Sequence, residues 1–582
     1  MFRCPACMML ILILASAASG AIIVDDDGAG NFKKIQDAIN ASEIGDEIVV
    51  LNGTYPENIV VDRPIVLKGE EKPIIKSCGQ SSPLITITSD GVTLEGFSFI
   101  GSLNDSFNSG AILVLADRSN IQSNSISDSS GNGLCLRDSM DNLVLGNLIS
   151  DNKYAGVRII RANSSKVLNN KIFQNGGPGI AMESSQSDIL AQNEVDENGE
   201  VGIHIAGSNT IDVALNKIRS NAEDGVALLD SSNNVFVENE VHNSHHNGVN
   251  LYRSGNNFVL NNIIRDSGED GLLVIGLSND NTIAGNIIHA NDINGIGVYG
   301  SYFSAFSNNE IFLNGYNGIT LRDNSSSIMV SDNEIYENEM YGLSLDGSDN
   351  NVIRNNELYD NQNGIIMVRS DDNVLEFNKI YDNRFGLSME FVDNVVVSGS
   401  DIHNNTNHGI QLMDIHRSKL WRNVIHDNGD DGVHISGSEH VVAYRNDIMN
   451  NGEYGIQLLD SSLQNLFVYN YIQHNRYGAY IYDGELNLFF SNTFADNTNF
   501  DVRDNDANRW VSNYYGDYPG GDLDGDLIGD EPYVIEGRRR AISFDTTPMM
   551  TPIWSGEGRG PLVPGAINVT EIAELEGLIN GT

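Results

Sequence analysis

The sequence predicts a parallel β-helix, an all-β solenoid in which short strands coil around a common axis. Three observations lead to this prediction. A glycine followed by an apolar residue or alanine recurs at intervals of 22 to 24 residues over positions 110–478. A column of asparagines keeps the same period, each two residues before an apolar position. Runs of three to five residues rich in Ile, Val and Leu lie between them, as expected for strands.

The repeating unit reads N-x-[ILV]-x-x-N-x-x-x-G-[ILV]-x-[ILVM], followed by a loop and a third short strand such as NNVFVEN (233–239). A unit of about 23 residues punctuated by Gly and Asn leaves no room for two helices, so a helical solenoid is disfavoured. We expect Asn and Gly to adopt left-handed turn conformations and stacked asparagines to hydrogen-bond from coil to coil. The glycine column comprises Gly110, Gly133, Gly156, Gly179, Gly202, Gly225, Gly248, Gly271, Gly295, Gly318, Gly342, Gly364, Gly386, Gly409, Gly432, Gly455 and Gly478.

The first 20 residues are predicted to be a secretory signal peptide. The apolar stretch MMLILILASAASGA follows Arg3 and ends in small residues. No other stretch approaches the roughly 20 apolar residues that a membrane span needs. We therefore expect an exported protein of the extracellular space, periplasm or cell envelope, with no membrane span after signal cleavage.

Residues 21–109 are expected to form the N-terminal cap and first coils, and 110–499 the regular repeats. Within 25–40 the pattern predicts a short amphipathic helix, with Phe32, Ile35 and Ile39 covering the first coil. Sixteen repeat intervals at a strand spacing of about 4.8 Å predict a rod on the order of 80 Å long. On this geometry Cys78 and Cys135 lie about 12 Å apart, too far for a disulfide, so two free thiols are predicted.

Residues 500–553 are expected to form a C-terminal cap, followed by a linker and tail at 554–582. The aromatic stretch RWVSNYYGDY (509–518) would cover the last coil. An Asp-rich loop follows, DLDGDLIGDE (522–531), whose alternating carboxylates are the hard oxygen ligands that Ca²⁺ prefers. The candidate calcium ligands are Asp522, Asp524, Asp526 and Asp530.

The formal net charge is −45. Such an acidic surface repels phosphate backbones, so nucleic-acid binding is disfavoured, while binding of divalent cations is favoured. Alternatively, the negative charge has no binding role and only keeps the protein soluble.

Several segments together resemble one protein family. These are DAINASEIGDEIVVLNGTYPENIVVDRPIVLKGE (37–70), the N-x-I…N-x-x-x-G-I coils and the terminal DGDLIGDEPYVI (524–535). They resemble the NosD-like, carbohydrate-binding and sugar-hydrolase (CASH) branch of right-handed parallel β-helix proteins over about residues 22–553, a resemblance that specifies fold rather than chemistry. It implies a pectin-lyase-like fold. Relatives of this kind include polysaccharide lyases, epimerases and hydrolases, surface proteins, and a periplasmic accessory of copper-enzyme maturation.

The stretch HDNGDDGVHISG (426–437) is the main candidate for an active site. Asp430, Asp431 and His434 occupy variable positions, and the repeat places His408 in the adjacent coil. Paired carboxylates with a histidine suit general acid/base cleavage or epimerisation of a polysaccharide. An Asp before the column glycine also caps a tight turn, and Glu223-Asp224 and Glu269-Asp270 repeat the acidic pair, so a structural role is the alternative.

Besides catalysis, the sequence leaves open two binding functions: binding of a carbohydrate or surface partner, and binding of copper. Hydrogen-bonding and aromatic side chains in outward positions suit a carbohydrate or surface partner, and binding without catalysis is the leading interpretation. The candidate carbohydrate contacts are Gln411, Gln457, Tyr252, Tyr299, Arg322, Glu390, Tyr480 and Tyr482. Copper binding is considered because His403 and His426 are stacked neighbours, but a solvated histidine ladder is favoured over a copper site, since no Met or Cys accompanies them at ligand spacing.

Overall fold

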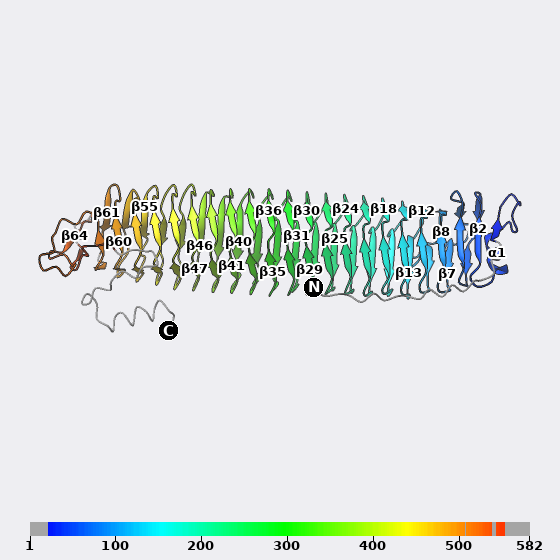
Figure 1. Ribbon diagram of the computed structural model, residues 1–582, viewed down its shortest axis with the longest axis horizontal. Coiled ribbons are helices and arrows are strands. Elements are labelled where there is room, and N and C mark those ends of the chain that lie inside the picture. Colours follow the sequence, from blue (N-terminus) through cyan, green and yellow to red (C-terminus); the bar gives the residue numbers. More distant parts are fainter. Residues whose placement is uncertain (1–20, 507, 538–542, 553–582) are drawn as a thin grey trace, which may run out of the picture.

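A computed structural model describes residues 21–506, 508–537 and 543–552. The described chain forms a long rod of three parallel β-sheets (Figure 1), which confirms the predicted β-helix. Sheet A has 24 strands between β1 (Ile22–Val24) and β65 (Ser543–Asp545). Sheet B runs from β3 (Thr54–Pro56) to β63 (Tyr514–Tyr515), and sheet C from β4 (Ile59–Val61) to β61 (Phe500–Asp504). The predicted signal peptide and the tail beyond residue 552 lie outside the described residues.

Each coil contributes one strand to each sheet. One coil consists of β50 (Lys419–Trp421) in sheet A, β51 (Val424–His426) in sheet B and β52 (Val433–Ser436) in sheet C. Leu420 and Ile425, the central residues of the two three-residue strands of this coil, are fully buried, and in β52 Val433 and Ile435 point inward. In the regular coils, strands pair in parallel register with the strand 22 to 24 residues earlier, so equivalent side chains form straight columns along the rod.

Asparagine ladders run along the turns between the sheets, as predicted. Asn428 is typical, since its Nδ2 donates to Asn451 Oδ1 at 3.0 Å and to the Ile402 carbonyl at 3.2 Å. Its own Oδ1 accepts the backbone N–H of Asn405 at 3.1 Å and the Asn405 Nδ2 at 2.9 Å. These bonds satisfy turn backbone groups that the sheets leave unpaired.

The expected left-handed Asn and Gly residues are present in the turns, as at Asn404 (φ 55°) and Gly437 (φ 59°), but the ladder asparagines and column glycines are not among them. The left-handed residue precedes the ladder asparagine, as in Asp427 (φ 55°) before Asn428. Gly432 has no left-handed backbone and is required for space instead. A Cβ there would lie 2.6 Å from Ile448 Cγ2 and 2.7 Å from Asn451 Nδ2 of the next coil.

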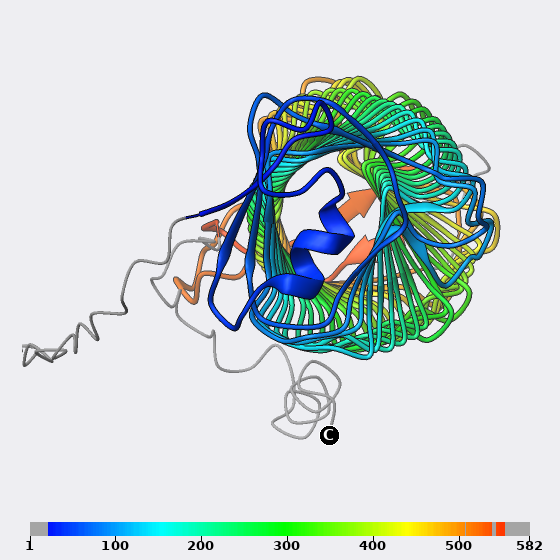
Figure 2. The ribbon, with the colours of Figure 1, turned by 90° about the vertical axis from the view of Figure 1, so that its right-hand side faces the viewer.

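The two ends of the rod are covered differently. Helix α1 (Ile35–Ala41) lies across the opening of the first coils (Figure 2) and buries Ile35, Ala38 and Ile39 against them. Phe32 precedes this helix and bridges to Val24 of β1. The expected N-terminal capping helix is therefore present, although it begins after Phe32.

The C-terminal end is closed by aromatic stacking and an antiparallel strand pair. Trp510 of β62 (Arg509–Val511) stacks on Phe489 with ring centroids 4.0 Å apart, and Tyr515 stacks on Tyr533 at 3.8 Å. Strand β64 (Tyr533–Ile535) pairs antiparallel with β65. Asp545 of β65 is buried and accepts the backbone N–H and the Nδ2 of Asn513, which terminates an asparagine ladder.

The two cysteines of the described residues are free, as predicted. Cys78 is exposed and Cys135 is buried. Burial raises the pKa of the Cys135 thiol to about 12. No helix in the described part of the chain is long and apolar enough to cross a membrane.

Candidate functional site

The predicted Asp–His cluster lies on sheet C, where one outward position repeats through five successive coils. The strands are β46 (Phe385–Glu390), β49 (Ile410–Met413), β52, β55 (Tyr454–Leu459) and β58 (Tyr477–Ile481). We call this set of side chains the polar column. Register pairing places side by side Ser388, Gln411, His434, Gln457 and Tyr480. The repeat therefore puts Gln411 and Gln457 on either side of His434, as the sequence predicts.

Asp431 lies beneath the polar column, with a side chain only 2% exposed. Its Oδ1 accepts the backbone N–H of Tyr454 in the next coil at 3.1 Å. Its Oδ2 lies 2.9 Å from His434 Nδ1. One oxygen therefore joins two coils, while the other fixes the orientation of an imidazole.

The first of these two bonds is structural and recurs along the rod. Asp224 Oδ1 accepts the backbone N–H of Asn247 at 2.9 Å, and Asp270 Oδ1 accepts that of Asn294 at 3.0 Å. The acidic residue before the column glycine thus bonds a backbone N–H, as the turn-cap alternative requires, but in the next coil rather than within its own turn. Asp431 differs because its second oxygen bonds a histidine.

His408 completes the cluster from the preceding coil. Its ring stacks on that of His434 with centroids 4.5 Å apart and an interplanar angle of 19°. His408 Nδ1 accepts the backbone N–H of Asp431 at 3.2 Å, so this nitrogen carries no proton. Burial lowers the pKa of His408, and the neighbouring His434 lowers it further, against the opposing charge of Asp431. The neutral form of His408, with its proton on Nε2, is therefore favoured.

Asp430 provides a second carboxyl group with a different environment. Its side chain is 42% exposed, and its Oδ2 lies 3.6 Å from His408 Nδ1. Partial burial raises the pKa of Asp430, the charge of Glu453 raises it further, and His434 lowers it. The cluster thus combines a carboxyl that takes up a proton more easily than a free Asp with an imidazole oriented by a buried carboxylate. These are the elements of general acid/base chemistry.

Tyrosines continue this surface beyond Gln457. The ring of Tyr454 stacks on Tyr480 with centroids 5.2 Å apart and on Tyr477 at 4.8 Å. The ring centroids of Tyr480 and Tyr482 are 6.2 Å apart, and the Tyr482 side chain is 43% exposed. Tyr454 and Tyr477 were missed from the sequence, although each fills the position before a column glycine. The tyrosines form an aromatic patch at one end of the polar column.

The other predicted carbohydrate contacts lie apart from this cluster. Tyr252 ends β28 (Val249–Tyr252) and Tyr299 ends β34 (Ile296–Tyr299), with Ile275 between them in the same column. Arg322, at the end of β37 (Ile319–Arg322), forms an ion pair with Asp346 at 3.0 Å. Glu390 ends β46, beside Met413. Apolar residues interrupt this second column, so these four side chains form no continuous surface.

The Asp-rich loop brings three of its four predicted ligands together. Carboxylate oxygens of Asp522, Asp524 and Asp526 lie within 4.8 Å of one another. Asp522 accepts backbone N–H groups of the loop, including that of Gly525 at 2.6 Å. Asp530 Oδ2 accepts the backbone N–H of Leu523 at 2.6 Å and closes the loop. Calcium binding here stays a prediction.

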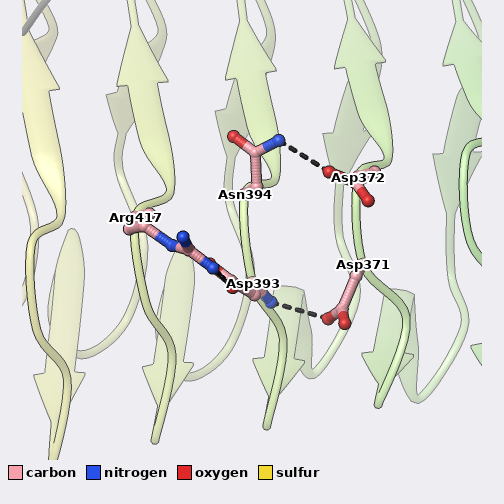
Figure 3. A pocket seen from close by; sticks show the side chains of 5 residues that line it. All are labelled: Asp371, Asp372, Asp393, Asn394 and Arg417. Atoms are coloured by element: carbon pink, nitrogen blue, oxygen red, sulfur yellow. Dashed lines mark hydrogen bonds and ion pairs between the residues drawn. The ribbon is translucent and has the colours of Figure 1, made fainter. Parts of the chain in front are cut away.

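A polar hollow of ≈330 Å³ lies on the turns between sheets C and A (Figure 3). Arg417 extends toward Asp393 (Figure 3) and forms an ion pair with it, with Nε donating at 2.8 Å. Asp371 accepts the backbone N–H of Asp393 at 2.8 Å, and Asn394 donates to Asp372 at 2.6 Å. The lining groups thus bond one another across neighbouring coils. We therefore assign these residues a structural role rather than a ligand-binding one.

Sheet B carries a continuous ring stack, which we call the ring ladder, of which the sequence predicted only the stacked pair His403 and His426. Its centroid separations are 4.7 to 5.1 Å and its interplanar angles 2° to 17°. In the sequence, seven consecutive coils each have an aromatic residue or a histidine three residues after the asparagine or serine of the turn between sheets A and B. This pattern could have revealed the stack. The rings belong to His289, Phe312, Tyr336, Tyr359, Tyr381, His403 and His426.

The ring ladder is poorly suited to sugar stacking. Each inner ring is covered on both faces by its neighbours, and a sugar needs an open face. The hydroxyl of Tyr359 donates to Glu334 Oε1 at 2.8 Å, and that of Tyr381 to Glu357 Oε1 at 2.8 Å. The tyrosine hydroxyls and ring faces therefore stabilise the rod itself.

The model of the family described as "Right handed beta helix region" matches four overlapping segments, residues 83–235, 190–330, 321–468 and 417–513. The chain belongs to the right-handed β-helix family. This agrees with the resemblance found in the coils, and with the pectin-lyase-like fold that it implies.

One curated relative is a cell surface glycoprotein of Methanothermus fervidus, 39% identical over 75 residues. The match covers 12% of this chain and 13% of that protein.

Two solved structures show a distant similarity to this chain. The Dettilon tailspike protein is 15% identical with a TM-score of 0.39, over 51% of this chain and 62% of that one. The A-module of the mannuronan C-5 epimerase AlgE6 of Azotobacter vinelandii is 14% identical with a TM-score of 0.29, over 81% and 94%. These scores are too low to transfer any site residue.

Proposed function

We propose that the protein is an exported rod of the cell surface or extracellular space that binds an extended polysaccharide along the polar column of sheet C. The observation that carries this proposal is the unbroken register of Gln411, His434, Gln457 and Tyr480 in four successive coils, with the buried Ser388 (2% exposed) closing the column at one end. Hydroxyl, amide and imidazole groups in successive coils suit a linear chain of sugar hydroxyls. The aromatic patch beside them offers the ring surface that glycan-binding sites commonly use.

The length of the column supports an extended ligand over a compact one. Successive coils present one side chain about every 4.8 Å, which is comparable with one hexose of an extended chain. The chain is strongly acidic, and Asp430 adds a partly exposed carboxylate at the site, so a neutral glycan is favoured over a polyanion. A surface location is supported by the relative named cell surface glycoprotein.

The proposal is tested by glycan binding with matched variants. Neutral and charged polysaccharides are screened by pull-down and titration calorimetry against His434→Ala, Gln457→Ala and Tyr480→Ala. Each lost hydrogen bond is worth about 0.5–1.5 kcal/mol, so each polar variant should weaken binding by about 2- to 10-fold. Ser344→Ala is the control, because it lies in the same outward column four coils away from His434. Equal weakening by the control, or no binding to any glycan, would reject the proposal.

A second candidate function is cleavage or epimerisation of the bound glycan, favoured by the 2.9 Å bond between Asp431 and His434. In this reaction His434 acts as the base and Asp430 as the acid. Asp431→Asn is the best probe, since the amide oxygen still accepts the Tyr454 N–H while the charge that supports the imidazole is lost. Products are followed as new reducing or unsaturated ends for cleavage, and as a changed sugar composition in proton NMR for epimerisation, which breaks no glycosidic bond. Products made by wild type and abolished in Asp431→Asn and His434→Ala, with binding retained in Asp431→Asn, would establish an enzyme. Binding without products would establish a binding rod.

A further inference from the structure

We infer that Asp401, His403 and His426 form a binding site for a divalent transition metal ion on sheet B, away from the polar column. Asp401 and His403 are the two ends of β48 (Asp401–His403), and His426 ends the neighbouring strand β51. One ligand atom from each side chain lies within 4.8 Å of the other two. All three side chains are partly exposed, so an ion can reach them from solvent.

The distances are close to those of a bound ion. Ligand atoms about 2.0–2.1 Å from a tetrahedral Zn²⁺ lie about 3.3 Å from each other. His426 Nε2 is 3.1 Å from Asp401 Oδ1, and His403 Nε2 is 4.0 Å from Asp401 Oδ2. Both imidazoles therefore direct Nε2 toward one carboxylate, although toward different oxygens of it. These two separations need to change by less than about 1 Å, and the ligand atoms of the two histidines, within 4.8 Å of each other, must also approach.

The end of the ring ladder allows the movement that the two histidines need. Their rings are stacked with centroids 4.8 Å apart, so one ring must tilt to bring both nitrogens onto one ion. His426 is the last ring of the ladder, because the residue paired with it in the following coil is Met449. Contrary to the sequence expectation, a methionine thus adjoins this histidine pair. Its unbranched, flexible thioether side chain permits a tilt that a further stacked ring would oppose.

Asp427 supplies the outer-shell contact that metal-bound histidines use. Its Oδ2 lies 2.6 Å from His426 Nδ1. A carboxylate on the far nitrogen fixes the ring orientation and keeps the proton on Nδ1, so that the Nε2 lone pair is available for a metal. The cluster therefore holds a carboxylate–histidine pair in addition to its three ligands.

The lysine in the neighbouring coil bonds another carboxylate, so the Asp401 carboxylate faces the two histidines. The residue paired with Asp401 in the preceding coil is Lys379, and that in the following coil is Val424. The Lys379 ammonium bonds Glu357 at 2.9 Å, one coil farther away.

The ligand set also selects the kind of ion. Two imidazoles and one carboxylate suit Zn²⁺, Cu²⁺ or Ni²⁺ better than Ca²⁺ or Mg²⁺, which prefer oxygen ligands alone. Three protein ligands leave a fourth position for water or an external ligand. The ion would clip two adjacent coils together.

The experiment uses Zn²⁺ in calorimetry and Co²⁺ in visible spectroscopy on the mature chain. Wild type should bind one equivalent at this site, with the intense visible bands of tetrahedral Co²⁺. His403→Gln and His426→Gln should each remove that equivalent and those bands. Asp427→Asn should weaken binding about 10- to 100-fold, because only the outer contact is lost.

Two controls separate this site from other histidines. His289→Gln changes the opposite end of the ring ladder, where the ring stacks on Phe312 and lies beside Arg265, and should leave Zn²⁺ affinity unchanged. His434→Gln changes the other histidine pair and should also leave this equivalent intact. The inference is overturned if wild type binds no stoichiometric Zn²⁺, or if binding survives both His403→Gln and His426→Gln. Loss of that equivalent in His434→Gln would likewise reject it, by moving the ion to sheet C.

Discussion

Removing one ladder asparagine should open the rod locally, and Asn428→Ala measures by how much. The Asn428 side chain is 2% exposed and takes part in four hydrogen bonds, two as acceptor and two as donor. Alanine leaves the buried backbone N–H of Asn405 without its acceptor. A buried unsatisfied donor costs about 1–3 kcal/mol, and the lost bonds to the other groups bring the expected cost to about 3 kcal/mol.

Hydrogen exchange followed by mass spectrometry is the suitable assay, because it reports local opening within one part of the rod. An increase of about 3 kcal/mol in the native free energy corresponds to roughly 100-fold faster exchange in peptides spanning 402–428, at about 1.4 kcal/mol per factor of ten. Peptides many coils away should be unaffected, since each coil contacts only its neighbours.

Asn428→Ser provides the matched control for this prediction. The rod uses serine at this same turn position in two other coils, where Ser244 Oγ and Ser267 Oγ are buried without a hydrogen-bond partner. Serine at 428 should therefore fail to replace the acceptor for Asn405, and exchange should be as fast in Asn428→Ser as in Asn428→Ala. Exchange in Asn428→Ala within threefold of wild type, or protection largely restored by serine, would refute the reasoning.

Three further predictions concern pH, thiols and calcium. Burial raises the pKa of Asp188 to about 7, so its stabilising contribution is complete below about pH 4 and is lost as the pH rises through 7; Asp188→Asn should remove this dependence and stabilise the protein at pH 8 by about 1–4 kcal/mol in urea denaturation. Cys78 should react with a thiol reagent in the native protein, whereas Cys135, with its pKa raised to about 12 by burial, should react only after unfolding, as a thiol titration will show. Calcium should slow proteolysis of the 522–530 loop, and Asp524→Asn combined with Asp526→Asn should abolish that effect; equal proteolysis with and without calcium would contradict it.

The sequence predicts most of the fold because the repeat is strict. A constant period fixes which side chains are neighbours, so His434 could be placed between Gln411 and Gln457 without coordinates. The left-handed residues were not predictable in the same way. They precede the ladder asparagine and include types as different as Asp427 and Leu215, so the backbone adopts this conformation because of the ladder bonds rather than because of its own side chain.

The candidate site was predictable in position but not in burial. Asp430 and Asp431 are chemically identical neighbours in the sequence, yet one is 42% exposed and the other 2%. That difference depends on which side of the turn each carboxylate lies, and no periodicity specifies it. Only the His403–His426 end of the ring ladder was predicted, because the other members are 22 to 24 residues apart and were considered one at a time.

Because the described rod is covered only at its two ends, its length can change without any change in the side chains of the polar column. Helix α1 and the β64–β65 pair lie at the two ends of the rod, and the inner coils pair with the coil on either side through the same three parallel sheets. Duplication or deletion of a whole coil between the N-terminal cap and β46 would therefore move the polar column farther from, or closer to, that cap without altering its side chains. The distance from one end to the binding surface can thus change during evolution in steps of about 4.8 Å, independently of what is bound there.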